Sequence, residues 1–173
     1  MKSVLTIISL LVCSCFIPAS EKWADDLHIR VELTTGENSK DSSSETTAIS
    51  AGRNAVEWEK TFSGRRGGTP PLRKEFELSP ADKRNLAGLI ESNNLLVTNS
   101  IELPQASSNY RYFKISVDLT LGEKKGAINF RGMRKAVKIK EEKLYQTTLI
   151  LVKELYRIMN SQDKSVLYEE LVY

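Results

Sequence analysis

Residues 56–78 read VEWEKTF (56–62), SGRRGGTPP (63–71) and LRKEFEL (72–78). In both outer segments apolar side chains alternate with polar ones, which is the pattern of a strand with one buried face. The segment between them is rich in glycine and proline, the residues that turns favour. The stretch therefore predicts two strands joined by a loop.

On the N-terminal side, Leu27 to Leu33 show the same alternation and predict a further strand. Residues 48–51 and 56–62 are predicted to pair as a hairpin, because Gly52 to Asn54 supply turn residues that tolerate positive φ. Residues 36–47 are polar and without apolar periodicity, so we expect a flexible loop there.

On the C-terminal side, Ser79 is followed by Pro80 and, in the first turn, Asp82, a strong signal for a helix start. We expect this helix to run over about residues 80–93. A loop is predicted over residues 97–109, which contain Pro104.

Tyr110 to Leu121 give the clearest strand pattern of the chain, and Ala127 to Phe130 are predicted to return beside it as a hairpin. A helical stripe of apolar residues then covers about residues 141–160. Residues 166–173 are expected to be either a docked tail or a frayed end. The fold class predicted is α+β, with a mainly antiparallel sheet of about five to six strands packed by two helices.

The 173 residues, with 40% hydrophobic and 27% charged residues, fit one globular domain. Without residues 1–20 the formal charge falls from +3 to 24 − 22 = +2, because only Lys2 is lost. A nearly neutral chain does not favour nucleic acid as a partner, and the basic cluster between Arg131 and Lys143 lacks an accompanying nucleic-acid-binding motif.

The N-terminus has the layout of a cleaved signal peptide over residues 1–20, with Lys2 before an apolar run that is too short to span a membrane. Residues 12–15, Val-Cys-Ser-Cys, resemble a bacterial lipobox that would make Cys15 the lipidated residue. The alternative is cleavage after Ala19 or Ser20. We favour the lipobox, which predicts a membrane-anchored lipoprotein, over a soluble exported protein; residues 21–173 then form one domain.

Both cysteines, Cys13 and Cys15, lie in the signal region, so residues 21–173 have neither a disulfide nor a thiolate metal site. The single histidine, His28, falls on the polar side of its strand and is expected to be a surface residue. We therefore expect no metal site, no cofactor and no catalytic residue.

The best candidate for a specific site is the loop at residues 63–71, where we assign partner binding to Arg65, Arg66, Gly67 and Gly68. Backbone amides near glycines, beside two guanidinium groups, can bind an anion. The spacing is not that of a phosphate-binding P-loop, and a plain hairpin turn is the other interpretation.

The residues of 63–68, Leu78-Ser79-Pro80 and 110–117 resemble those of small exported bacterial domains of unknown function. More distantly, the layout of residues 27–159 is similar to that of emfourin-type inhibitors of thermolysin-like metalloproteases. In those inhibitors, glycine-containing loop residues before the first helix approach the enzyme. The resemblance implies an α+β fold and, for residues 63–68, contact with a protease.

The expected function is that of a non-enzymatic binding module of the bacterial envelope, which includes protease inhibition among its forms. Its expected partner is an envelope protein rather than nucleic acid, with membrane attachment through a lipid anchor if Cys15 is acylated. The alternative is an envelope protein that binds a small ligand or anion.

Overall fold

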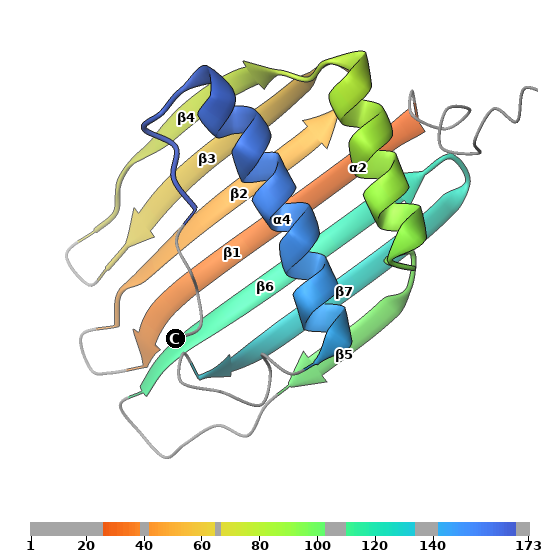
Figure 1. The fold of residues 1–173 in the computed structure, drawn as a ribbon. Coiled ribbons are helices and arrows are strands. Elements are labelled where there is room, and N and C mark those ends of the chain that lie inside the picture. The colour runs from red at the N-terminus through yellow and green to blue at the C-terminus, as the bar shows by residue number, and fades with distance from the viewer. Residues whose placement is uncertain (1–25, 39–41, 65–66, 103–109, 134–141, 169–173) are drawn as a thin grey trace, which may run out of the picture.

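The computed structural model describes residues 26–38, 42–64, 67–102, 110–133 and 142–168. These residues form seven strands and two helices (Figure 1). In chain order the elements are β1 (Leu27–Asn38), β2 (Ser44–Gly52), β3 (Ala55–Ser63), β4 (Thr69–Glu77), α2 (Pro80–Ser92), β5 (Thr98–Glu102), β6 (Tyr110–Leu121), β7 (Lys124–Met133) and α4 (Lys143–Gln162).

The strands form one sheet in the order β4-β3-β2-β1-β6-β7-β5. The α+β class and the two helices are confirmed, but the predicted sheet of five to six mainly antiparallel strands is wrong. The sheet has seven strands and is mixed, because β5 pairs with β7 in parallel. Strand β1, the first in the chain, lies fourth of the seven and is the central strand.

Two sequence-based expectations for loops are corrected by the strand bounds. Strands β1 and β2 run into the predicted loop at 36–47, with Gly36 paired to Ser44. Strand β5 lies within the predicted loop at 97–109. Both segments are mostly polar, so they lack the apolar alternation by which strands are detected.

Helix α2 begins as its sequence predicts: the Ser79 hydroxyl accepts a hydrogen bond from the Asp82 amide at 3.1 Å, and Pro80 opens the first turn. Helix α4 spans 143–162 rather than about 141–160. A helix of 20 residues is about 30 Å long, enough to cross a sheet of seven strands.

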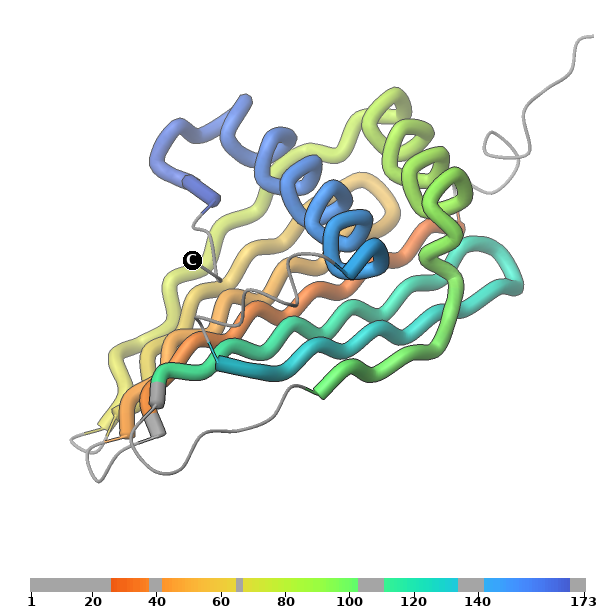
Figure 2. The backbone as a smooth tube through the Cα atoms, turned by 60° about the horizontal axis from the view of Figure 1, so that its bottom comes forward, coloured from red at the N-terminus to blue at the C-terminus, as the bar shows by residue number. Residues whose placement is uncertain are grey.

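Both helices lie on the same face of the sheet, α4 reaching from β7 to β4 (Figures 1 and 2). At its start the Tyr145 ring meets the rings of Phe130 and Phe113 edge-on, with centroids 5.3 and 6.4 Å away. At its end, Gln162 and Asp163 bind strand β4. Apolar residues on every second position of the long strands fill the space beneath, led by Ile29, Val31, Ile49, Val56, Ile115, Val117, Ile128 and Phe130.

The polar positions of the same strands point to the other face, which no described helix or strand covers (Figure 2). We call it the open face. Its alternation with the core follows from the two-residue period of the strand backbone. His28 belongs to this face and is exposed, as its place in the sequence predicts.

The outer edge of β4 is occupied at two places. Pro70 and Pro71 carry no amide hydrogen that could pair with a further strand. At the other end, the Gln162 side chain accepts from the Glu77 amide at 2.9 Å and donates to the Glu77 carbonyl at 2.8 Å. The side chain thus takes the two hydrogen bonds that a neighbouring strand would make.

The segment after α4 folds back against the sheet. Lys74 donates to the Asp163 carboxylate at 2.6 Å and to the Ser165 hydroxyl at 2.7 Å, while Val166 is buried. The Tyr168 ring packs edge-on against Tyr156, with centroids 5.4 Å apart. Of the two expectations for the tail, docking therefore holds for residues 166–168; residues 169–173 lie outside the described part.

Candidate partner-binding site

The loop that sequence analysis singled out joins β3 to β4 at the end of the sheet that the helices do not reach (Figure 1). Arg65 and Arg66 lie outside the described residues. On either side of them the Gly67 amide donates to the Gly64 carbonyl at 3.0 Å, so the chain reverses direction here. Gly67 and Gly68 are exposed.

Glycine is required at positions 67 and 68, which directly follow Arg65 and Arg66. Gly67 has φ of 100°, which side chains rarely adopt. A Cβ on Gly68 would lie 2.8 Å from the carbonyl oxygen of Phe62, closer than backbone atoms tolerate. The pair of glycines is therefore explained by the geometry of the turn, and a role in binding a partner is additional to it.

Two large apolar side chains stand exposed beside this turn. Leu72 is 56% exposed and Phe62 is 38% exposed. Both come from positions on the helix side of the sheet, but α2 and α4 end short of them. We call Phe62, Leu72, Lys60 and Glu45 the tip patch.

Lys60 holds the tip patch in place. Its ammonium lies 2.8 Å from the Glu45 carboxylate and 5.4 Å from the centre of the Phe62 ring. The ion pair and the cation–π contact fix the ring although no core residue covers it. An irregularity in the pairing between Lys60 and Phe62 shifts the end of β3 relative to β4.

Beside Phe62 lies a shallow hollow of about 380 Å³ between the ends of β1, β2 and β3. Its walls include Ser63 and Glu45, and on the far side Arg111, which donates to the Glu37 carboxylate at 2.7 Å. Phe62 lines this hollow, so this end of the sheet has a concave surface next to an exposed apolar side chain.

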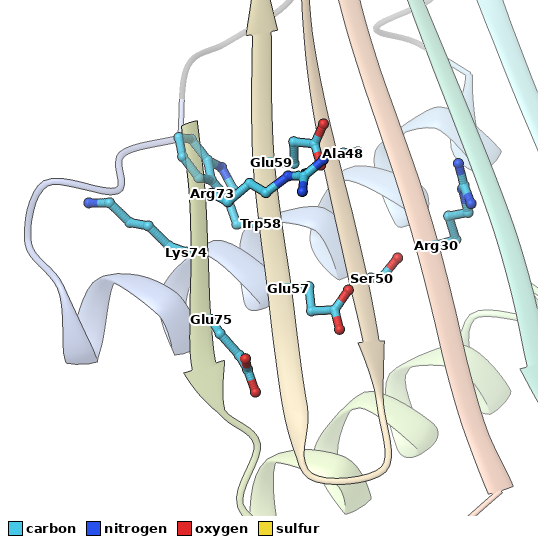
Figure 3. A pocket seen from close by; sticks show the side chains of 9 residues that line it. All are labelled: Arg30, Ala48, Ser50, Glu57, Trp58, Glu59, Arg73, Lys74 and Glu75. Carbon is cyan, nitrogen blue, oxygen red and sulfur yellow. Dashed lines mark hydrogen bonds and ion pairs between the residues drawn. The ribbon is translucent and has the colours of Figure 1, made fainter. Parts of the chain in front are cut away.

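Two further hollows, about 510 and 520 Å³ in volume, lie on the open face and share Arg30, Ser50 and Glu57. Figure 3 shows the residues that line the first of them. Both hollows follow strand β2, whose residues on this face are all small. Longer side chains of β1 and β3 stand on either side. We call the depression the trough; its floor is Ala48, Ser50, Gly52 and Ala55.

Two of the three arginines that line the trough, Arg30 and Arg73, are paired; the third is Arg53. The Arg30 guanidinium lies 2.7 Å from the Glu32 carboxylate, and this hydrogen bond raises the pKa of Arg30. Arg73 reaches across to Glu59 at 2.8 Å (Figure 3). Within the described part of the chain, Glu57 and Glu75 have no ion pair, although they are directly opposite each other on β3 and β4. The uncompensated charge of the rim is negative.

The single histidine, His28, and Tyr112 do not share a cleft. The His28 ring lies against Gly52 at one end of the sheet, and the Tyr112 ring lies over Gly36 near the other. His28 and Gly36 are eight residues apart on β1, about 27 Å in a strand. Among the described residues there is also no group of three or more His, Cys, Asp or Glu side chains suited to a metal ion.

Sequence reasoning found the loop but missed the tip patch and the trough. Phe62 and Leu72 alternate with polar residues as core positions do, so their pattern predicts burial. The small residues of β2 are visible in the sequence, but they become a trough only once the strand is known to lie between β1 and β3.

Cys15 and the whole signal region lie outside the described residues, as do Arg134 to Lys140 of the basic cluster. Within the described residues, neither helix has the length and apolar character needed to cross a membrane. In comparisons with known proteins, no family model and no curated protein matches this chain.

Proposed function

We propose that this chain is an exported, non-enzymatic interaction module of the bacterial envelope that binds another protein through the tip patch and the adjoining Arg65–Arg66 loop. The observation that carries the proposal is the exposure of Phe62 and Leu72 beside the turn. Exposed apolar side chains that adjoin one another are characteristic of surfaces that contact a partner.

The tip patch offers apolar area to a partner. Burying one side chain the size of Leu72 contributes about 1.5–3 kcal/mol, and aromatic residues such as Phe62 are enriched at protein interfaces. The Phe62 ring is held by Lys60 before any partner arrives, so little side-chain entropy remains to be lost there.

Protease inhibition is the specific form of binding that the resemblance to emfourin-type inhibitors suggests. The loop before the first helix is the segment that approaches the enzyme in those inhibitors, and in this chain residues 63–68 occupy the corresponding place. The test is inhibition of a thermolysin-like metalloprotease by the purified protein. Unchanged proteolysis at excess protein would exclude this form and leave other protein partners to be tested.

The general proposal is tested by quantitative pull-down from envelope extract. Leu72→Ser, and Arg65→Ala combined with Arg66→Ala, should each lower recovery of a specific partner at least tenfold. Ile150→Ser is the matched control, because Ile150 is 47% exposed on the outer side of α4 and far from the loop. Equal recovery by all four proteins would refute the tip patch as the binding surface.

A small ligand in the trough is the second candidate, because each hollow has a volume within the range of ligand sites. The paired arginines and the unpaired Glu57 and Glu75 favour a cationic ligand over an anion. A thermal-shift screen should then show stabilisation by organic amines that Glu57→Gln abolishes. No stabilisation by any amine, or a shift that survives the substitution, would count against the trough as the site.

Membrane attachment is proposed to depend on Cys15. If the lipobox is used, Cys15→Ser abolishes acyl labelling and releases the protein from the membrane fraction, whereas Cys13→Ser retains both. Membrane retention by Cys15→Ser would instead support cleavage after Ala19 or Ser20 and another mode of attachment.

A further inference from the structure

The open face carries its charges unevenly. On β3 and β4 it has one base and four acids, 1 − 4 = −3: Arg73, Glu57, Glu59, Glu75 and Glu77. On β6, β7 and β5 it has three bases and two acids, 3 − 2 = +1: Lys114, Lys125, Arg131, Asp118 and Glu102. One half of the face is therefore acidic and the other half is basic.

We propose that the open face binds the open face of a second copy of this chain, related by a two-fold axis along β1. Such an axis lays the acidic strands of one copy over the basic strands of the other, and it does so twice because the contact is symmetric. Strand β1 is the central strand of the seven, so β3 faces the partner's β7 and β2 faces the partner's β6.

The twist of the sheet does not oppose this arrangement. A uniformly twisted sheet has the shape of a saddle, and a saddle is unchanged by a half-turn about its central strand. Two copies related in this way stay at constant separation across their width, as in aligned packing of sheets. We call a row the set of residues that pair with one another across the strands at one height of the sheet. Residues of the two copies that lie on the same row then face one another.

The strongest match involves the partner's Lys125. Its row is Lys125–Thr120–His28–Gly52–Ala55–Glu77, so the two-fold places this lysine over Ala55. Ala55 leaves room for the lysine side chain, with Glu77 beside it and Glu57 two residues along β3. Glu57 also faces Glu75, and two like charges on opposed strand positions destabilise a sheet. A cation beside Glu57 weakens that repulsion.

Arg131, Asp118 and Glu102 also find complements, whereas Lys114 lies over Thr46, and Arg30 and Glu32 on the axis each face their own copy. Arg131 is on the row of Thr61, so the partner's Arg131 lies two residues along β3 from Glu59. Asp118 is on the row of Ser50 and Arg30, so the partner's Asp118 faces the Ser50 hydroxyl beside the Arg30 guanidinium. The partner's Glu102 lies over the end of β4, next to Arg73.

The face is large enough for a stable dimer. Seven strands at about 4.8 Å spacing and about eight residues at 3.3 Å give about 900 Å² per copy, against about 800 Å² per partner in standard complexes. Polar and charged side chains make up this interface, so its affinity should fall as salt screens the charges. The tip patch is on the helix side, and it remains free in the dimer.

The test uses residues 21–173, which include every described residue, in sedimentation equilibrium at about 50 mM and at about 500 mM salt, where screening differs several-fold. We expect a dimer at low salt whose dissociation constant rises at least tenfold at high salt. Lys125→Glu alone and Glu57→Lys alone should each be monomeric. Their equimolar mixture should form a heterodimer, because one contact is native and the other has its charges exchanged.

Lys124→Glu is the matched control, since Lys124 neighbours Lys125 but points to the other side of the sheet, and it should dimerise like the wild type. A wild-type monomer at low salt overturns the proposal. So does a dimer that survives both reversals, or single variants that become monomeric but fail to associate when mixed. Circular dichroism of each variant separates loss of pairing from loss of folding.

Discussion

At the scale of single residues, two glycines with opposite environments test the packing. A Cβ on Gly126 would lie 2.7 Å from the Leu95 carbonyl and 2.9 Å from the Val97 amide nitrogen, both backbone atoms that cannot turn aside. We expect Gly126→Ala to lower the free energy of unfolding by about 1–3 kcal/mol, the usual cost of overpacking.

Gly88 is the matched control for Gly126. It lies in helix α2, and a Cβ there would meet nothing within 4 Å. Gly88→Ala should raise the free energy of unfolding by about 0.4–1 kcal/mol, because alanine restricts the unfolded chain. Urea denaturation of both variants measures the two effects, and equal changes would contradict the predicted close approach at Gly126.

Asp163 predicts how stability depends on pH. The Lys74 ammonium, followed by the amide and hydroxyl of Ser165, lowers the pKa of Asp163 from 3.8 to about 2. A depressed pKa in the folded state stabilises the fold fully above pH 3.8, and the contribution is lost as the pH falls towards 2. The effect is modest because both side chains of the ion pair are partly exposed.

We therefore expect Asp163→Asn to have a lower Tm than the wild type at pH 6, with the difference shrinking between pH 4 and about 2. Thermal unfolding monitored by circular dichroism over this range measures it. Glu123→Gln, in the turn between β6 and β7, should follow the wild-type curve. A Tm difference for Asp163→Asn that stays constant down to pH 2 would show that its carboxylate is not the group responsible.

At the scale of secondary-structure elements, the edge of β4 is closed by a side chain rather than a strand. Gln162→Ala removes both hydrogen bonds to Glu77, so the Glu77 amide should exchange with solvent faster. Native-state hydrogen exchange measures this directly. The Leu78 amide, which donates to the Asn54 carbonyl at 2.8 Å, is the internal control and should keep its rate.

The elements that sequence analysis found are those with one face on the core. Residues 27–33, 56–62 and 110–121 alternate because the helices cover one of their two faces. Strand β5 was missed because four of its five residues are polar and mostly exposed. Each residue of β5 pairs with a residue of β7 that comes 127 − 98 = 29 positions later in the chain, so no local hairpin signal could reveal the pairing.

For the candidate site, the sequence indicated the turn between β3 and β4 but not the exposed apolar side chains beside it. Glycine and proline mark the loop by their backbone requirements, which are local. The exposure of Phe62 and Leu72 depends instead on where α2 and α4 end relative to the sheet. That limit is set by tertiary packing, which no window of sequence contains.

At the scale of the whole molecule, the helices cover only one face of the sheet, so consecutive residues of a strand differ in burial. Ile115 is fully buried in the core, whereas Lys114 is exposed on the open face. Ile115→Ala should cost about 2–5 kcal/mol of unfolding free energy, and Lys114→Ala should stay within about 0.5 kcal/mol. Denaturant unfolding at low protein concentration and high salt compares them as monomers; similar losses would contradict a one-sided core.

The closed edge of β4 also limits what the folded chain can build. Pro70, Pro71 and the Gln162 side chain leave β5 as the edge at which the described sheet can add a strand. Two copies joined there would present a blocked β4 at both outer ends. Edge-to-edge growth therefore stops after one addition, so the folded protein resists polymerising into a fibre through its sheet edges.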